Sequence, residues 1–111
     1  MEITFRVFYK THFGQIPVVS GNIPQLGNLE PEKATEMVLI DVNSGQWELK
    51  IKLPASVKSL EYRYYIKDNN YNTFIQEWGQ NRVIELDGKG MLVADSWRSN
   101  SDPRYALFSK A

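Results

Sequence analysis

The stretch QWELKIKL, Gln46 to Leu53, decides the fold class. Apolar and charged residues alternate along it, so that one face would carry Trp47, Leu49, Ile51 and Leu53, and the other Glu48, Lys50 and Lys52. A period of two is typical of an antiparallel strand that packs one face on a core and leaves the other in water. We therefore expect a strand here, with Trp47 as a core residue.

The same alternation recurs on both sides of this stretch. ITFRVFYK (Ile3 to Lys10) and LEYRYYIK (Leu60 to Lys67) repeat it, and shorter candidates are IPVVSG, EMVLIDV, NTFIQ, RVIEL and MLVADSW. Turn-forming segments such as GNIPQLGN, KDNNYN and LDGKG separate them. About seven or eight short strands at this spacing predict an all-β fold, an immunoglobulin-like antiparallel β-sandwich.

Composition excludes several classes of function. A chain of 111 residues is expected to form one domain. It has no cysteine, and His12 is its only histidine, which leaves no Cys or His cluster for a metal. Its 13 basic and 13 acidic residues are interspersed, so no basic stripe favours nucleic acid as a partner. The first residues, MEITFRVFYK, lack the apolar run of a signal peptide, and no later run is long enough to predict a membrane partner.

The segment QEWGQNR, Gln76 to Arg82, places a tryptophan among polar and turn-forming residues. Burying Trp78 would bury the polar groups beside it, so we expect it to be exposed. An exposed indole beside amides, a carboxylate and a guanidinium fits a sugar, because the C–H face of the sugar packs on the ring while its hydroxyls need donors and acceptors. The alternatives are an aromatic that contacts another protein, or an isolated exposed ring without a function.

The order of the motifs resembles the family 20 carbohydrate-binding modules, the starch-binding domains of amylases, glucoamylases and glucanotransferases. In family order the chain carries ITFRV, THFGQIPVVSGNIPQLGN, WELKIKLPAS, EYRYYI, EWGQNR and DSWR, which cover nearly all of it. GNIPQLGN is similar to the family's GS-x-P-x-LG-x-W loop, and EYRYYI to its EYKF strand. A closer likeness is to the first of two such modules at the start of the disproportionating-type 4-alpha-glucanotransferases, which also carry a THxG turn.

The resemblance implies a first sugar site around the QEWGQNR segment. Glu77 and Asn81 match the family residues, Arg63 stands at the position of the family's lysine, and Gln76 stands at that of its tryptophan. Trp78 lies two residues after Gln76, so it would share a face with Gln76 and substitute for the missing ring if the strand continues.

The resemblance also implies a second site and two departures from the family. Leu29 replaces the loop tryptophan of the first site, and losing one stacking ring should weaken binding by roughly 1–3 kcal/mol. Phe13 matches the aromatic residue of the second site, whereas the shortened loop before Trp47 offers no aromatic partner for it. The resemblance implies no catalytic residue, no cofactor and no metal.

These observations predict a module over residues 1–98, followed by a linker or the start of another domain over 99–111. We expect a non-catalytic module that binds alpha-1,4-glucan and sits beside the catalytic domain of a larger enzyme, of the 4-alpha-glucanotransferase or amylase type. The alternative is a structural or docking sandwich whose sugar binding is weak or lost. An independent glycosidase does not fit, because so small a sandwich offers no deep cleft for two carboxylates. The lack of a leader and the closest resemblance favour a cytoplasmic location.

Overall fold

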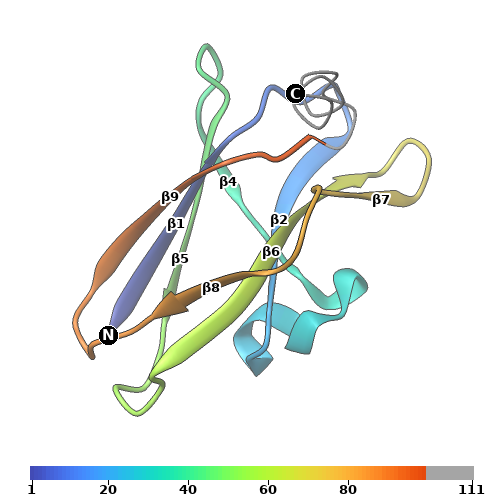
Figure 1. Cartoon of the computed structure of the whole chain (residues 1–111). Coiled ribbons are helices and arrows are strands. Elements are labelled where there is room, and N and C mark those ends of the chain that lie inside the picture. The colour runs from blue at the N-terminus through green and yellow to red at the C-terminus, as the bar shows by residue number, and fades with distance from the viewer. Residues whose placement is uncertain (100–111) are drawn as a thin grey trace, which may run out of the picture.

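Nine β-strands form two sheets in the computed structural model, which describes residues 1–99 (Figure 1). The first sheet has the strand order β4–β5–β1–β9 and consists of β1 (Glu2–Phe8), β4 (Val38–Asp41), β5 (Gln46–Lys52) and β9 (Met91–Ser96). The second has the order β3–β2–β6–β7, with β8 also on β6, and consists of β2 (Gln15–Gly21), β3 (Thr35–Glu36), β6 (Ser59–Asp68), β7 (Thr73–Gln76) and β8 (Arg82–Glu85). Of the segment 99–111, predicted to be a linker or the start of another domain, all but Ser99 lies outside the described residues.

The predicted all-β sandwich is confirmed, and two features refine it. EMVLIDV forms two strands in place of one, because the chain changes sheets at the buried Met37: β3 pairs with β2, and β4 pairs with β5. The pair β1–β9 is parallel, with Phe5 opposite Val93, whereas the other paired strands are antiparallel. Parallel neighbours need a long connection, and here nearly the whole domain provides it.

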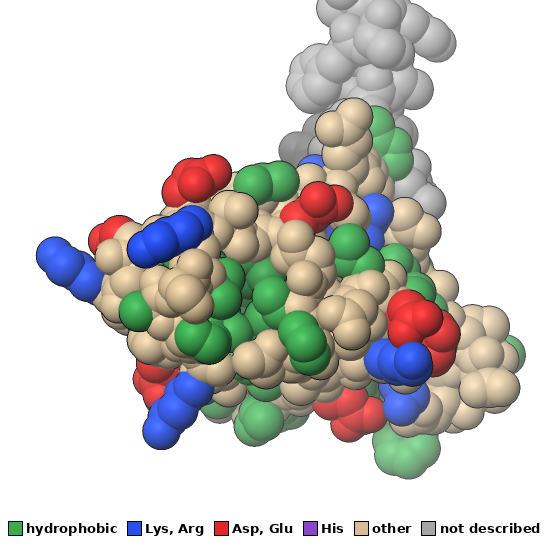
Figure 2. All heavy atoms as spheres, turned by 90° about the horizontal axis from the view of Figure 1, so that it is seen from below, with side chains coloured by type: hydrophobic (Ala, Val, Ile, Leu, Met, Phe, Trp, Pro, Cys, Tyr) green, Lys and Arg blue, Asp and Glu red, His purple; other side chains and the backbone are tan. Residues whose placement is uncertain are grey.

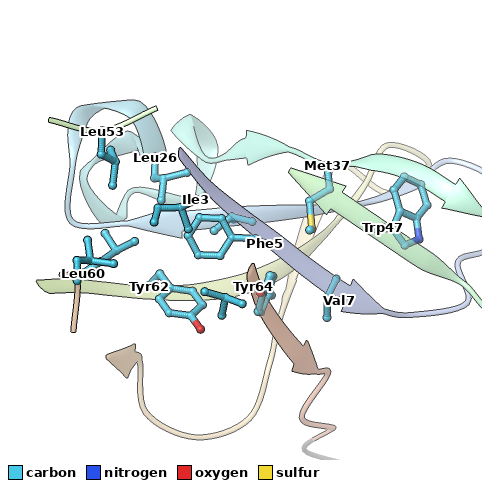
Figure 3. Close-up of a cluster of buried hydrophobic side chains, with 13 residues drawn as sticks. Ile3, Phe5, Val7, Leu26, Met37, Trp47, Leu53, Leu60, Tyr62 and Tyr64 are labelled. Carbon is cyan, nitrogen blue, oxygen red and sulfur yellow. The ribbon is translucent and has the colours of Figure 1, made fainter. Parts of the chain in front are cut away.

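The core lies between the sheets and includes most of the side chains that the alternation along the three longest predicted strands placed inward, while Leu49 and Ile51 are partly buried and pack against it (Figure 3). β1 contributes Ile3, Phe5 and Val7, β6 contributes Leu60, Tyr62 and Tyr64, and Trp47 and Leu53 come from β5 and the residue after it. The rings of Phe5 and Tyr62 meet across the sandwich with centroids 5.1 Å apart. Trp47 is buried, as predicted, and its indole N–H donates to the carbonyl of Tyr9 at 3.1 Å, so that its one polar group is satisfied.

GNIPQLGN folds as a 3-10 turn, η1 (Pro24–Leu29), followed by η2 (Pro31–Lys33). These turns place the buried Leu26 over one end of the core. Figure 2 shows this end of the molecule, where hydrophobic side chains lie in the middle and most charged side chains lie around the edge. Within residues 1–99 no helix has the length and apolar character needed to cross a bilayer.

Candidate carbohydrate-binding site

The QEWGQNR segment lies along one edge of β6. Strands β7 and β8 both pair with this edge, β7 ending with Gln76 opposite Tyr65 and β8 beginning with Arg82 opposite Tyr62. Residues 77–81 therefore leave the sheet between the two strands and form a turn beside Arg63 and Tyr64. We call residues 77–81 the Trp78 turn. Because β7 ends at Gln76, the strand does not continue to Trp78 and the shared face expected for these two residues is not formed.

Arg63 holds the Trp78 turn from below through its guanidinium. One terminal nitrogen donates to the carbonyls of Glu77 at 2.7 Å and Gly79 at 2.9 Å, and the other donates to Oδ1 of Asn81 at 3.1 Å. The planar fork of arginine holds its donors in a fixed array on three nitrogens, so it reaches acceptors farther apart than the donors on the single nitrogen of a lysine can. Arg63 is only 7% exposed, so its side chain supports the turn from inside and offers little surface to a ligand.

Glu77 is a buried carboxylate held by cations and a backbone N–H. It accepts from the Tyr64 N–H at 3.0 Å, from Arg82 at 2.8 and 3.2 Å, and from Arg98 at 3.4 Å. Burial raises the pKa of this carboxyl, but the hydrogen bonds from Arg82, Tyr64 and Arg98 outweigh burial and hold the pKa below its usual value. The residue is 1% exposed, so Glu77 lies beneath the turn and presents almost no surface to solvent.

Trp78 is the part of the turn that reaches solvent. Its exposed fraction is 48%, as expected from its polar neighbours. Its backbone N–H donates to the carbonyl of Arg98 at 2.7 Å, and the Arg98 guanidinium donates to the carbonyl of Gln80 at 2.6 Å. The backbone on both sides of the indole is therefore fixed before any ligand arrives, which reduces the entropy lost on binding.

A second layer of polar groups, which the sequence did not predict, lies behind the turn. Asp95 accepts hydrogen bonds from the hydroxyls of Tyr62 at 2.6 Å and Tyr64 at 2.8 Å, and it pairs with Arg82 at 3.3 Å. Burial raises the pKa of both tyrosines, and the bonds to Asp95 add to that increase. This network joins the turn to the core strand β6 and to β9. In the sequence, Arg82 ends the motif EWGQNR and Asp95 begins the motif DSWR, but no local pattern links the two.

The structure brings together five of the six residues predicted to bind sugar. Gln76 and Trp78 are exposed, Asn81 is half-buried, and Arg63 and Glu77 are buried beneath them. Asn81 also donates to Glu61 at 2.6 Å, which fixes its amide. Leu29, at the position of the family's loop tryptophan, is half-buried and has a left-handed backbone with φ of 65°.

The sixth residue, Phe13, lies apart from the Trp78 turn. It belongs to the turn that joins β1 to β2, and 94% of its side chain is exposed. Among residues 1–99, no group of three or more His, Asp or Glu side chains is arranged to hold a metal ion. What the described residues offer to a ligand is therefore aromatic surface with amides beside it.

Sequence comparison assigns the chain to a family. The model of the family described as a starch binding domain matches residues 1–95. The chain belongs to this family of starch-binding domains. Such domains are non-catalytic modules within larger amylolytic enzymes, and the family predicted from the motif order is confirmed.

Similarity to individual proteins supports the same family assignment for this starch-binding domain. It is 37% identical over 97 residues to an alpha-amylase of Streptomyces violaceus, which covers 86% of this chain and 16% of the amylase. It is 27% identical over 119 residues to the 4-alpha-glucanotransferase DPE2 of Oryza sativa subsp. japonica, which covers 100% of this chain and 12% of that enzyme. The crystal structure of the family 20 module of the maltotetraose-forming amylase from Pseudomonas saccharophila STB07 matches with a TM-score of 0.68 and 25% identity, over 87% of this chain and 100% of that module. The starch-binding domain thus covers 12% to 16% of the length of its glucoamylase, glucanotransferase and amylase relatives.

Proposed function

We propose that the module binds an alpha-1,4-glucan chain on the Trp78 turn and thereby keeps an attached catalytic domain close to starch or a similar polymer. The observation that carries this proposal is an indole exposed to 48% on a turn whose backbone is held by Arg63 and Arg98. An exposed aromatic ring on a backbone that is already fixed by hydrogen bonds is preorganised, so little conformational entropy is lost when a ligand binds to it.

The chemistry of the turn matches a pyranose ring. The indole of Trp78 offers a flat apolar face for the C–H groups of the sugar. Gln76 is the last residue of β7, and Asn81 is the last residue of the Trp78 turn. From these positions their side-chain amides can donate to and accept from sugar hydroxyls. Arg63 and Glu77 act indirectly in this proposal, because they set the position of the backbone that carries the ring.

The attached partner would be the catalytic domain of an alpha-glucan-acting enzyme, of the glucanotransferase or amylase type. Support comes from the relatives, which include a 4-alpha-glucanotransferase and an alpha-amylase of which this chain matches only a small part. A polymer with many copies of the binding epitope makes modest affinity sufficient, because binding raises the effective concentration of substrate at the enzyme.

A second candidate function, docking to another protein surface, is favoured by the edge strand β4. All of its residues are exposed, among them Val38 at 62% and Ile40 at 53%, and the strand has a paired neighbour on one side only. Exposed apolar edge strands are places where another chain can add. A malto-oligosaccharide that changes the intrinsic tryptophan fluorescence would favour sugar binding, since a module used only for docking has no reason to respond.

Calorimetric titration with maltoheptaose tests the sugar-binding proposal, with a cellulose oligomer as the control ligand. We expect saturable binding to maltoheptaose alone, and at least about tenfold weaker binding after Trp78→Ala, given the size of a typical stacking contribution. Phe8→Ala is the matched control variant, because Phe8 is a similarly exposed ring, at 43%, on the outer face of β1.

Two results would contradict the proposal. Wild-type protein that fails to bind maltoheptaose at millimolar concentration would leave docking as the function of the module. Equal weakening by Trp78→Ala and Phe8→Ala would show that the effect is not specific to the Trp78 turn.

A further inference from the structure

Strands β6 and β7 carry a small aromatic surface on the outer face of the second sheet. Tyr64 points into the core, so its neighbour Tyr65 points outward, and Gln76 lies opposite Tyr65 in the register of the two strands. Phe74, two residues before Gln76, lies on the same face of β7 and is 37% exposed. We call the surface formed by Tyr65, Phe74 and Gln76 the Phe74 face.

Contacts fix the two rings relative to each other and to the Trp78 turn. The rings of Phe74 and Tyr65 meet edge to face, with centroids 6.3 Å apart and an angle of 82° between their planes. The guanidinium of Arg63 lies over the Tyr65 ring, 5.8 Å from its centroid, and the same guanidinium donates to two backbone carbonyls of the Trp78 turn. The Phe74 face and the Trp78 turn therefore adjoin each other and share one support.

Two polar groups on this face are available to a ligand. Among residues 1–99 the hydroxyl of Tyr65 has no hydrogen-bond partner, whereas the hydroxyls of Tyr62 and Tyr64 both donate to Asp95. Gln76 is exposed, and residues directly opposite each other in an antiparallel pair have Cβ atoms about 4.5–5.5 Å apart, so its amide stands beside the Tyr65 ring. An exposed ring with a hydroxyl and an amide next to it matches the apolar face and polar rim of a pyranose.

The charged side chains at this face are already engaged. Lys67, which lies opposite Phe74 on β6, pairs with Glu36 of β3 at 3.1 Å. Arg63 is buried and directs its terminal nitrogens to the Trp78 turn. The groups left for a ligand are therefore neutral donors and acceptors, which suit a neutral polyhydroxylated molecule better than an anion.

The two side chains proposed above to contact sugar, Gln76 and Trp78, belong to different surfaces. β7 ends at Gln76, whose side chain lies on the Phe74 face, whereas Trp78 stands on the turn that follows. A glucan that touches both side chains must therefore extend from the turn onto the sheet. Phe74 is the exposed ring on that part of the sheet, two residues further along the same face of β7.

We propose that the Phe74 face binds the glucose units that follow those on the Trp78 turn in one alpha-glucan chain. Phe74 supplies the stacking ring, and the hydroxyl of Tyr65 and the amide of Gln76 bind sugar hydroxyls. This inference rests on the proposed function of the module and extends it from one turn to a continuous surface across turn and sheet. Such a surface takes several glucose units at once and so favours long chains over maltose.

Nuclear magnetic resonance of the 15N-labelled full chain, titrated with maltoheptaose, tests whether the surface is continuous. We expect the amides of residues 77–82 and those of 65–67 and 73–75 to shift with a single Kd, because one ligand molecule covers both groups. Phe74→Ala should raise that Kd at least about fivefold for both groups, as expected for the loss of one stacking ring. Phe8→Ala, which removes an exposed ring from the other sheet, is the matched control and should leave the Kd unchanged.

Tyr65→Phe is a second variant that tests the hydroxyl alone. It keeps the ring that contacts Phe74 and Arg63, so it should fold as wild type does. We expect it to weaken maltoheptaose binding roughly threefold or more, which is the effect of losing one hydrogen bond. Amide shifts of the unliganded variants that match wild type away from the substituted residue verify that they are folded.

The failure of this inference differs from the failure of the proposed function. Shifts confined to residues 77–82 would overturn the inference and leave the proposed function intact, whereas no shifts at all would overturn both. Two groups that titrate with different Kd values would report separate sites and would also overturn the continuous surface. The same conclusion would follow if Phe74→Ala and Tyr65→Phe both bound maltoheptaose as tightly as Phe8→Ala does.

Discussion

Glu77 keeps its charge inside the protein because its neighbours replace the water it has lost. Arg82 comes from β8 and Arg98 follows β9, so both cations reach the carboxylate from segments distant from each other in the chain. A buried charge that loses its partners is strongly destabilising, even where the intact pair adds little to stability. The stability of the Trp78 turn therefore depends on this carboxylate as well as on the bonds from Arg63.

Glu77→Gln should lower the free energy of unfolding by about 3 kcal/mol at neutral pH, because it removes the carboxylate shared by Arg82 and Arg98 and leaves Arg82 with Asp95 as its one anionic partner among residues 1–99. Urea denaturation followed by tryptophan fluorescence measures this change. Glu85→Gln is the matched control, because Glu85 is exposed on the same strand as Arg82 and its replacement should have little effect.

The same substitution should change how stability depends on pH. The folded pKa of Glu77 lies below its ordinary value of 4.5, so the unfolded chain takes up the proton first as the pH falls. The contribution of Glu77 is complete above about pH 4.5 and is lost as the pH falls through the folded pKa. The stability difference between wild type and Glu77→Gln should therefore shrink below that pH. A difference that stays constant down to the acid transition would show that the charge of Glu77 is not responsible.

At the scale of single residues, the sequence predicted which apolar side chains are buried and which tryptophan is exposed, but it did not predict the burial of charged residues. The polar neighbours of Trp78 were enough to predict an exposed ring, because burying it would have left unpaired polar groups. Glu77 and Arg63 were predicted to contact a ligand, yet both are buried. Their burial depends on acceptors and cations that only the folded chain brings together, and no local pattern records those pairings.

Strands were the most predictable elements, because alternation along β1, β5 and β6 records directly which face is buried. Two element-level features could not be predicted. The change of sheet at Met37 interrupts what looks like one continuous apolar run, and the parallel pairing of β1 with β9 joins segments with no sequence relation. Both are set by how the two sheets close around the core, so neither leaves a local signal.

The η1 element gives a sharp test of backbone geometry. Gly27 has φ of +78°, and a Cβ there would collide with the carbonyl of Lys33. Gly27→Ala should therefore lower the free energy of unfolding by more than about 2 kcal/mol, since it combines left-handed strain with a clash against backbone. Thermal unfolding followed by circular dichroism measures it.

Gly88→Ala separates the two causes. Gly88 has a similar φ of +85°, but a Cβ there would meet nothing closer than Ala55 at 3.9 Å. It should show only the left-handed strain, about 1–2 kcal/mol. Equal losses in the two variants would mean that the Lys33 carbonyl moves aside.

At the scale of the whole molecule, the sandwich is closed by its last strand. β9 pairs with β1, contributes the core residue Val93 and carries Asp95 of the buried network. A chain that ends at residue 90 lacks β9 and should therefore fail to fold, although it still contains the other eight strands. A chain that ends at residue 99 should keep the unfolding free energy and maltoheptaose affinity of the full chain, which circular dichroism and calorimetry can compare. Folding of the shorter fragment, or unfolding of the longer one, would show that the boundary of the module is misplaced.

The parallel pairing of β1 with β9 has a mechanical consequence. In this register Ile3 lies opposite Met91 and Phe8 opposite Ser96, so the start of β1 and the end of β9 lie at opposite ends of the pair. Tension applied between residues 1 and 99 would pull the two strands past each other, loading their hydrogen bonds in shear so that many must break together. Antiparallel terminal strands would instead be peeled apart one bond at a time. Under the proposed function, in which the module links a catalytic domain to a polymer, this arrangement would make that link resistant to force.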